Sequence, residues 1–349
     1  MSDPLKELFP VLARRVPRTR LADLPTPVSR HNVNVGGKEH EVAVKHDDVT
    51  GKIYGGNKVR KLEFLLRRAA DRKAKRIATF GTVASNHALA TALYAKSLGF
   101  ECTCFLSHQT KTPNCARVLN MHLANGTEIV RFGGKRADMV ATMRRYLQGR
   151  EAWAIPPGGS NWLGVIGFVN AGLELAQQVR SGELQEPEYL YVANGTMGTA
   201  SGLTLGLALA ALDTEVQAIR VTHKFVANRQ AMRSLIAKTA TLMHMLDESV
   251  PTDLANRVRL SFRDDFFGDG YARTTEEADR AVEFAEAELG LVLETTYTGK
   301  ALAALLHDLR GSASNVLFWN TYNSRALPAS TELPDDTSGL PEEFLRYFN

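Results

Sequence analysis

The stretch YLYVANGTMGTASGL at residues 189–203 runs from a short apolar segment through a turn of glycine and threonine into a segment of small residues. The apolar segment is typical of a buried strand, and the residues after the turn are typical of a helix. A strand that leads directly into a helix is the repeating unit of parallel sheets, so the stretch predicts an α/β fold.

Strand and helix alternate around this stretch, from residue 58 to about residue 220. Helices are expected at 58–75, 86–98, 113–125, 137–148, 162–180 and 199–211, and strands at 77–80, 101–106, 127–132, 152–155, 189–193 and 216–221. Further helices fit 226–246, 275–289 and 298–309, a last buried strand fits 315–320, and the polar tail at 328–341 is expected to be loop. Short apolar strands between amphipathic helices predict open parallel sheets built from right-handed crossovers.

The composition is that of a globular protein with room for two cores. The chain has 349 residues, of which 23% are charged and 44% hydrophobic, and a formal net charge of +4. This length allows two domains. The one dense basic run, RRAADRKAKR at 67–76, has helical spacing and no interleaved aromatic residues. We therefore expect a solvated helix face there and no binding of nucleic acid.

The cysteines and the N-terminal residues suggest a reducing compartment. Three cysteines do not make a disulfide framework, and no His and Cys spacing suggests zinc, so we expect no metal. Cys102 and Cys104 alternate in a strand and are expected to be buried thiols. The stretch MSDPLKELFP lacks the apolar core of a signal peptide, and no run of about 18 apolar residues occurs. We expect a cytoplasmic protein that does not enter a membrane.

The segment GGNKVRKLEFLL at 55–66 places Lys58 at the start of a helix, where the helix dipole disfavours a cation. One interpretation is a turn followed by a helix whose exposed face carries basic residues. The other is that Lys58 is an amine with a lowered pKa that acts as a nucleophile. The segment alone leaves both open.

Three further loops lie at strand ends or helix starts, where ligands bind in parallel sheets. In GTVASNHALATALYA at 81–95, Ser85 or Asn86 is either an N-cap or part of an anion site, and His87 alone is more often structural. The turn NGTMGTASGL at 194–203 has the ingredients of a phosphate cradle without the spacing of a dinucleotide site. In YTGKALAALL at 297–306, Thr298 suits an N-cap.

The four motifs in this order resemble one family, the pyridoxal-phosphate enzymes related to D-cysteine desulfhydrase and aminocyclopropane-carboxylate deaminase. Four other segments look like parts of the same family: LADLPTPV at 21–28, VKHDDVTG at 44–51, IPPGGSNWLGVIGFVNAGLELA at 155–176 and GDGY at 268–271. The resemblance covers residues 9 to 327.

The resemblance implies a fold like that of the tryptophan synthase β subunit. Two open parallel-sheet α/β domains would hold pyridoxal 5'-phosphate in the cleft between them, usually in a homodimer. The large domain would comprise residues 1–60 and 168–349, and the small domain residues 61–167.

The resemblance also implies the residues that hold the cofactor. Lys58 would form the Schiff base, with Lys61 and the helix dipole opposing its protonation. Asn86 would bond the ring hydroxyl of the cofactor, and Thr298 would face the pyridine nitrogen. The phosphate loop would comprise Gly195, Thr196, Met197, Gly198 and Thr199, in which methionine is larger than the usual residue.

On the substrate side, Ser85, Asn86 and His87 look like the site for the substrate carboxylate. Tyr271 and Tyr297 match the tyrosines that line the substrate pocket. We count Ser85 and both tyrosines with Lys58 as the catalytic residues.

The activity implied is that of a lyase that cleaves a small β-substituted amino acid by α,β-elimination to pyruvate and ammonia, with D-cysteine as the first candidate. The deaminase branch has Glu at the position of Thr298 and Gln at that of His87, which favours elimination here. Alternatives are aminocyclopropane-carboxylate deamination, cleavage of cysteate or a diamino acid, and a catalytically altered cofactor-binding homologue. The last is kept because NTYN at 320–323 replaces the usual HTGG, and Tyr322 is expected to crowd the pocket.

Overall fold

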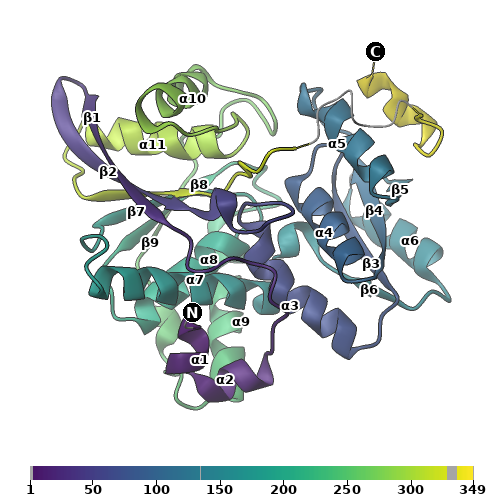
Figure 1. The fold of residues 1–349 in the computed structure, drawn as a ribbon, viewed down its shortest axis with the longest axis horizontal. Helices are drawn as coiled ribbons and strands as arrows, with labels where there is room; N and C mark the ends of the chain where they lie inside the picture. The colour runs from purple at the N-terminus through teal and green to yellow at the C-terminus, as the bar shows by residue number, and fades with distance from the viewer. Residues whose placement is uncertain (1–2, 134, 328–335, 349) are drawn as a thin grey trace.

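Two sheets form the frame of the computed structural model, which describes residues 3–133, 135–327 and 336–348 (Figure 1). The larger sheet has six strands in the order β1-β2-β10-β7-β8-β9, and the smaller has four in the order β5-β4-β3-β6. The strands are Val28–Val35 (β1), Lys38–His46 (β2), Arg76–Thr82 (β3), Glu101–Ser107 (β4), Glu128–Arg131 (β5), Ala152–Ala154 (β6), Tyr189–Asn194 (β7), Glu215–Arg220 (β8), Leu260–Arg263 (β9) and Val316–Asn320 (β10).

Neighbouring strands in both sheets are parallel, as the alternation of strand and helix predicts, except for the β1–β2 pair. This pair is an antiparallel hairpin, in which Val28 lies opposite Lys45. Its turn contains Gly36 and Gly37, both with positive φ (63° and 82°). Glycine adopts this left-handed conformation without the steric cost that other residues have.

Helices cover both faces of each sheet (Figure 1). The helices are Pro4–Leu8 (α1), Pro10–Arg15 (α2), Lys58–Asp71 (α3), Asn86–Ser97 (α4), Asn114–Ala124 (α5), Arg136–Leu147 (α6), Trp162–Arg180 (α7), Gly198–Leu209 (α8), Arg229–Leu246 (α9), Glu276–Leu289 (α10) and Thr298–Leu309 (α11). Short 3-10 helices lie at Asp47–Val49 (η1), Pro157–Gly159 (η2), Leu254–Asn256 (η3) and Glu342–Tyr347 (η5). The helices α10 and α11 pack on one face of the large sheet, and α7, α8 and α9 on the other.

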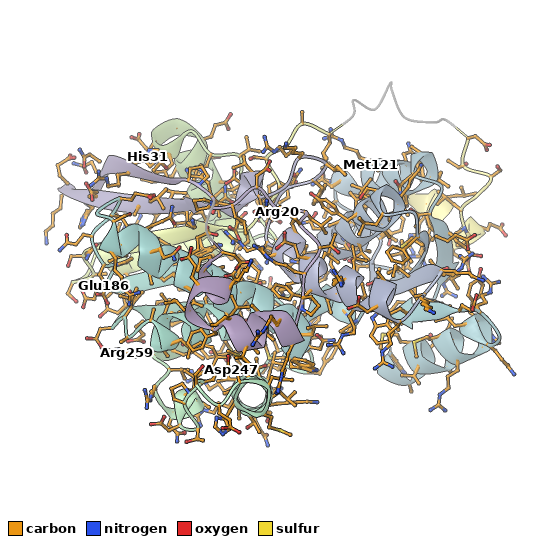
Figure 2. The ribbon with its side chains drawn as sticks, turned by 60° about the horizontal axis from the view of Figure 1, so that its bottom comes forward. Arg20, His31, Met121, Glu186, Asp247 and Arg259 are labelled. Carbon is orange, nitrogen blue, oxygen red and sulfur yellow. The ribbon has the colours of Figure 1, made fainter. Side chains whose placement is uncertain are left out.

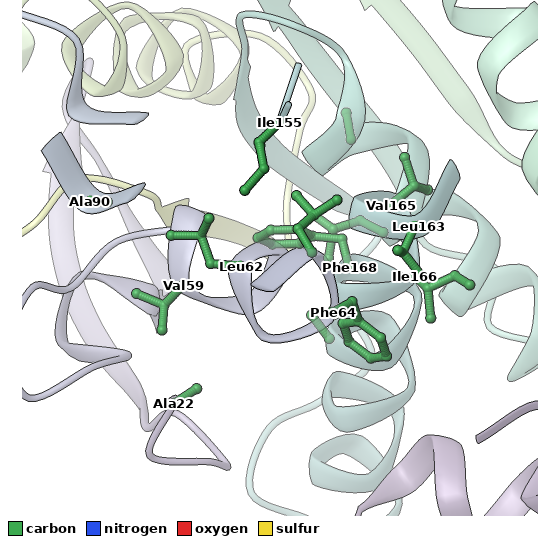
Figure 3. Packing of buried hydrophobic residues seen from close by; sticks show 14 of the residues in the cluster. Ala22, Val59, Leu62, Phe64, Ala90, Ile155, Leu163, Val165, Ile166 and Phe168 are labelled. Carbon is green, nitrogen blue, oxygen red and sulfur yellow. The ribbon is translucent and has the colours of Figure 1, made fainter. Parts of the chain in front are cut away.

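The main hydrophobic core continues from the large sheet into the small one through α3 and α7. Figure 3 shows Leu62 of α3 near Phe168 of α7. The two helices approach closely because residue 167 is glycine, where a Cβ would lie 2.2 Å from the backbone oxygen of Arg60. This contact holds the residues at the start of α3 in a fixed position between the sheets.

A buried ion network holds α3 to both β2 and α7. Arg60 of α3 contacts Asp47 at 2.7 Å and Glu174 of α7 at 2.9 Å, and Lys45 of β2 contacts Glu174 at 2.7 Å. All four side chains are at most 3% exposed. The two cations lower the pKa of the Glu174 carboxyl to about 2, against the effect of its burial.

The helices and strands expected between residues 58 and 320 are present, with one notable difference in length. The helix expected at 58–75 ends at Asp71, and Lys73 just beyond it has a φ of 55°, which ends the helical path. The expected buried thiols are confirmed, because Cys102 and Cys104 are 6% and 0% exposed. The division of the chain into two domains at residues 60/61 and 167/168 stays a prediction.

The C-terminal residues return to the small sheet. Of the expected loop, residues 328–335 lie outside the described part, and residues 336–348 lie beside α5 and β5 (Figure 1). Figure 2 labels Met121 of α5 on this side of the molecule and His31 of β1 on the other. Leu340, Phe344 and Tyr347 of the C-terminal residues belong to the main core.

The described residues contain neither a membrane-spanning helix nor a group of metal ligands. None of their helices is both long enough and apolar enough to cross a membrane. They also contain no group of three or more His, Cys, Asp or Glu side chains that could hold a metal ion.

Candidate active site

Lys58 is the first residue of α3. The side chain of Asn57 bridges its amine to α8 through two hydrogen bonds. The Nζ of Lys58 donates to Oδ1 of Asn57 at 2.6 Å, and Nδ2 of Asn57 donates to Oγ1 of Thr199 at 2.9 Å. The amine at the start of α3 is therefore held at a fixed place relative to the glycine and threonine loop at the start of α8.

The surroundings of Lys58 lower the pKa of its amine from 10.5 to about 8. Burial is the largest cause, because it disfavours the charged form, and the negative charge of Glu294 opposes this effect. The sequence predicts a lowered pKa, but it attributes the shift to Lys61 and the helix dipole. The structure shows burial as the main cause.

The loop after β7 turns sharply into α8. Met197 is the N-cap residue of α8 and has left-handed backbone angles, with φ of 68°. Its side chain finds room by packing against the main core. Thr222, just beyond β8, fixes the start of the loop, since its hydroxyl donates to the backbone oxygen of Gly195 at 2.7 Å. The backbone N–H groups at the start of α8 make this loop suitable for an anion.

Lys61, one turn after Lys58, lies against this same loop. Its Nζ donates to the backbone oxygen of Gly158 at 3.1 Å and to Oγ of Ser160 at 3.3 Å. Ser160 in turn lies 2.7 Å from Oγ1 of Thr196. A Cβ at Gly198 would lie 2.9 Å from Nζ of Lys61, so the amine lies directly at the start of α8.

Lys61 is only 2% exposed, and among the described residues no carboxylate lies within 4.0 Å of its amine. Burial and the positive charge of Lys58 hold the pKa of Lys61 well below its ordinary value. A buried amine beside free N–H groups and two hydroxyls is a set of donors that suits a phosphate. Sequence reasoning did not assign Lys61 to this site, because Gly158 and Ser160 are about a hundred positions away.

The loop before α4 places three predicted residues in different surroundings. Ser85 is the N-cap of α4, and its Oγ accepts from the backbone N–H of Ala88 at 3.2 Å. The amide oxygen of Asn86 accepts from the Tyr54 hydroxyl at 3.1 Å. His87 is buried with its Nε2 2.9 Å from Oγ1 of Thr79, and burial holds the pKa of the imidazole well below its ordinary value.

Tyr271 and Tyr297 lie together. Their hydroxyls are hydrogen-bonded to each other, and the Tyr271 hydroxyl also lies 3.4 Å from Oγ1 of Thr82. Burial raises the pKa of both phenols, so both keep their protons near neutral pH. Tyr271 comes from the loop after β9 and Tyr297 precedes α11, so two distant segments form this pair.

Glu294 is a residue that sequence reasoning missed. Its carboxylate accepts the backbone N–H groups of Thr296, Tyr297 and Thr298, each at 2.8 Å. The expected N-cap at Thr298 is therefore wrong: Tyr297 is the N-cap residue of α11, and Glu294 satisfies the free N–H groups. The Thr298 hydroxyl is bonded to Glu294 as well, at 3.2 Å from Oε1.

A cavity of about 40 Å³ lies between these loops. Of the predicted site residues, Asn86, Tyr271 and Tyr297 line it. The others do not: Lys58, Ser85, His87, Thr298 and the loop residues 195–199. Its other lining residues were not assigned from sequence, apart from Tyr322, which was expected to crowd the pocket: Tyr54, Ala84, Leu89, Gln109, Thr112, Asn114, Arg117, Val118, Glu294, Thr296, Tyr322 and Leu327. The Tyr322 side chain does enter the cavity lining, as the NTYN segment predicts.

Comparison with known proteins assigns this arrangement to a family. The family model described as "Pyridoxal-phosphate dependent enzyme" matches residues 19–321, which is more than half of the chain. The chain belongs to the pyridoxal-phosphate dependent enzyme family. The match includes Lys58, the loop before α8, Tyr271 and Tyr297, but it ends before the C-terminal residues.

Two relatives within this pyridoxal-phosphate family are named D-cysteine desulfhydrase. The protein from Klebsiella pneumoniae (strain 342) is 32% identical over 312 residues, which cover 84% of this chain and 89% of the relative. The protein from Salmonella paratyphi A is 31% identical over 339 residues, which cover 90% of this chain and 96% of the relative.

Solved structures of other proteins share the fold. A crystal structure of an ACC deaminase homologue has a TM-score of 0.75 and 27% identity, and the match covers 92% of this chain and 95% of that one. A threonine deaminase from T.th. has a TM-score of 0.61 at 22% identity, covering 93% and 99%. The expected two-sheet α/β architecture of pyridoxal-phosphate enzymes is thereby confirmed.

Proposed function

We propose that this pyridoxal-phosphate enzyme is a lyase that cleaves a small β-substituted amino acid by α,β-elimination to pyruvate and ammonia. The observation that carries the proposal is the buried amine of Lys58, whose pKa is about 8 and which Asn57 connects to the loop before α8. D-cysteine is the first candidate substrate, because two relatives that match 84% and 90% of the chain are named D-cysteine desulfhydrase.

The residues around the start of α8 fit the phosphate of the cofactor. Lys61 provides a buried amine, Thr196 and Thr199 provide hydroxyls, and the first turn of α8 provides free N–H groups. We propose that Gly195, Thr196, Met197, Gly198 and Thr199 surround the phosphate. When bound, pyridoxal phosphate supplies an electron sink for the carbanion that forms at the substrate Cα.

Asn86 and Thr298 are the residues proposed for the ring of the cofactor. The Asn86 side chain lines the cavity, which supports a bond to the ring hydroxyl. The proposed contact of Thr298 with the pyridine nitrogen has less support, because its hydroxyl is already bonded to Glu294. To make that contact, the Thr298 hydroxyl must give up its hydrogen bond to Glu294 and donate to the pyridine nitrogen instead.

Lys58 has two proposed roles, which follow one another. Its Nζ would first attach the cofactor covalently; the substrate amine would then take its place there, and the freed Nζ would remove the substrate Cα proton. A pKa of about 8 leaves roughly a tenth of the amine neutral at pH 7, against far less than a hundredth at the ordinary value of 10.5. A general base works best when its pKa lies near the working pH.

The substrate would lie between the start of α4 and the tyrosine pair. Ser85, Asn86 and His87 are proposed for its carboxylate, and Asn86 is the one whose side chain lines the cavity. The protonated phenols of Tyr271 and Tyr297 can donate to the group that leaves Cβ. In D-cysteine the Cα proton would go to Lys58, the Cβ–S bond would break with its electron pair leaving on sulfur, and a Cα=Cβ double bond would form. Water would then hydrolyse the released aminoacrylate to pyruvate and ammonia.

The test is a product assay on the holoenzyme with D-cysteine, L-cysteine, β-chloroalanine and 1-aminocyclopropane-1-carboxylate. We expect pyruvate and ammonia from at least one β-substituted alanine and little 2-oxobutanoate from the cyclopropane. Faster 2-oxobutanoate formation would favour the deaminase. A visible cofactor band that no amino acid shifts would favour a catalytically altered homologue.

We also propose a homodimer in the cytoplasm, on the resemblance to the family. Light scattering of the purified holoenzyme tests the dimer, for which we expect twice the chain mass of 38.4 kDa. A mass of a single chain would contradict it.

A further inference from the structure

The C-terminal segment Glu342–Tyr347 (η5), which lies outside the part of the chain matched by the family model, reaches the cavity wall. Phe344 and Tyr347 are 0% and 3% exposed, so the segment is firmly packed. The ring of Phe344 meets the edge of His108, with centroids 5.2 Å apart. This C-terminal segment lies beside α5 (Figure 1).

The hydroxyl of Tyr347 binds both backbone groups of Gln109. It accepts from the N–H of Gln109 at 3.1 Å and donates to the carbonyl oxygen of the same residue at 3.0 Å. It also lies 3.1 Å from Nδ1 of His108. Gln109 lies two residues after the end of β4, beyond the pairing of β3 with β4, which ends at Ser107. The hydroxyl of Tyr347 therefore makes the two backbone hydrogen bonds with Gln109 that a neighbouring strand would make.

Gln109 is in turn hydrogen-bonded to the loop before α4. Its amide oxygen accepts from the backbone N–H of Ala84 at 3.3 Å, and Ala84 directly precedes Ser85 and Asn86. Both Gln109 and Ala84 line the cavity. Since the amide oxygen is used in this bond, the amide nitrogen is the end of Gln109 that can donate to an oxygen of the substrate.

We propose that Tyr347 is a positioning residue of the active site, which acts from the C-terminal segment by holding Gln109 as a donor to the substrate carboxylate. This inference rests on the proposed function, since it names a determinant of substrate binding at the same cavity. It adds a part of the site that lies 26 residues beyond the end of the family match at residue 321.

The variant Tyr347→Phe deletes the hydroxyl and keeps the ring. Tyr191→Phe is the matched control, because it removes a tyrosine hydroxyl that donates to Asp308 at 2.8 Å on the large sheet, away from the cavity lining. The probe is β-chloroalanine, in the enantiomer that the wild-type holoenzyme cleaves. We expect Tyr347→Phe to raise KM roughly 5- to 10-fold, the value of one hydrogen bond, and to leave kcat within about 2-fold. Tyr191→Phe should change neither.

A double mutant tests the route through Gln109. If Tyr347 acts through this residue, KM of Tyr347→Phe/Gln109→Ala equals that of Gln109→Ala alone. If the fold-changes in KM of the two single variants multiply in the double mutant, Tyr347 does not act through Gln109. An unchanged KM in Tyr347→Phe would overturn the proposal outright.

Hydrogen exchange separates this proposal from the proposed function. In Tyr347→Phe, peptides that cover 83–88 and 107–112 should exchange faster than in the wild type, with no change in Tyr191→Phe. Unchanged exchange in these peptides would refute the positioning role. Should the wild-type enzyme cleave no β-substituted alanine, the proposed function fails, and the exchange measurement still decides the role of Tyr347.

Discussion

At the residue scale, the amine of Lys58 is the group whose reactivity depends most on its surroundings. Its pKa of about 8 means that the reactive neutral form increases as the pH rises through 8. The rate at which cofactor-free protein captures pyridoxal phosphate should therefore rise with a midpoint near pH 8 and level off above it. Stopped-flow absorbance across a pH series measures this midpoint, and a rate that still rises near pH 10 would contradict it.

Glu294→Gln tests the cause of this midpoint. The negative charge of Glu294 favours the protonated form of Lys58, so its loss should move the midpoint to lower pH. Glutamine keeps an oxygen that can accept the N–H groups at the start of α11. Glu276→Gln on the exposed side of α10 is the control and should leave the midpoint unchanged.

His122 of α5 makes the folded chain sensitive to acid. It is fully buried, and neither ring nitrogen has a hydrogen-bond partner among residues 3–133, 135–327 and 336–348. Burial lowers its pKa to about 4, so the folded state disfavours the proton that the unfolded chain binds below pH 6.5. The free energy of unfolding therefore decreases as the pH falls from 6.5 towards 4, because the unfolded chain binds this proton and the folded chain does not.

The variant His122→Leu should reduce this loss. Between pH 8 and pH 5, the free energy of unfolding of the variant should fall by about 2 kcal/mol less than that of the wild type. Urea unfolding at both values measures the difference. An equal change in the two proteins would show that His122 is not the group that titrates.

At the scale of single elements, the start of α8 depends on the absence of a side chain at Gly198. A Cβ there would lie 2.5 Å from Oγ of Ser160 and 2.9 Å from Nζ of Lys61, whereas a Cβ at Gly195 would meet nothing closer than 3.7 Å. We expect Gly198→Ala to displace Lys61 and to weaken retention of pyridoxal phosphate at least about 10-fold, the value of one charge-assisted bond. Gly311→Ala is the matched control, because Gly311 lies outside the proposed cofactor site and a Cβ there would meet nothing closer than 3.3 Å.

Equilibrium dialysis of the cofactor measures both alanine variants. Retention in Gly311→Ala should match the wild type. Equal retention in Gly198→Ala would mean that the phosphate does not lie between Lys61 and α8.

The elements that sequence reasoning predicted are those with a buried apolar run or a clear helical period. The strands β1, β2 and β9 were missed for a physical reason. The hairpin is half exposed: β1, VSRHNVNV, carries no apolar run, and β2, KEHEVAVKH, carries one of only three residues, at 42–44. The edge strand β9 has only four residues, LSFR. Pairing with neighbours, which the local sequence does not encode, makes these segments strands.

The site was predictable where residues lie in one motif and not where distant segments meet. Lys58, Asn86 and the tyrosines follow from motifs in a recognisable order. Lys61 was missed because its partners at 158–160 come from another loop. Glu294 was missed because its role, satisfying the N–H groups of α11, depends on how the chain turns after residue 294.

At the scale of the whole molecule, the ion network of Arg60, Asp47, Lys45 and Glu174 joins α3 to the large sheet and α7. Glu174→Ala leaves Lys45 without its carboxylate partner in a fully buried position. Removal of one partner from such a network costs about 3–5 kcal/mol. Chemical unfolding should show this loss, along with release of the cofactor, because α3 carries Lys58.

The surface pair of Arg280 and Glu276 on α10 is the control for this prediction. Its side chains are 72% and 83% exposed, so Glu276→Ala should cost under about 1 kcal/mol. If Glu174→Ala is no more costly than Glu276→Ala, the network does not hold α3 in place.

The central claim is that Lys58 is the residue to which pyridoxal phosphate is attached. Borohydride reduction of the holoenzyme, followed by peptide mapping, tests it most directly. We predict that the reduced cofactor is found on Lys58 and that Lys58→Ala carries no label. Label on Lys61 or Lys300 instead would contradict the assignment.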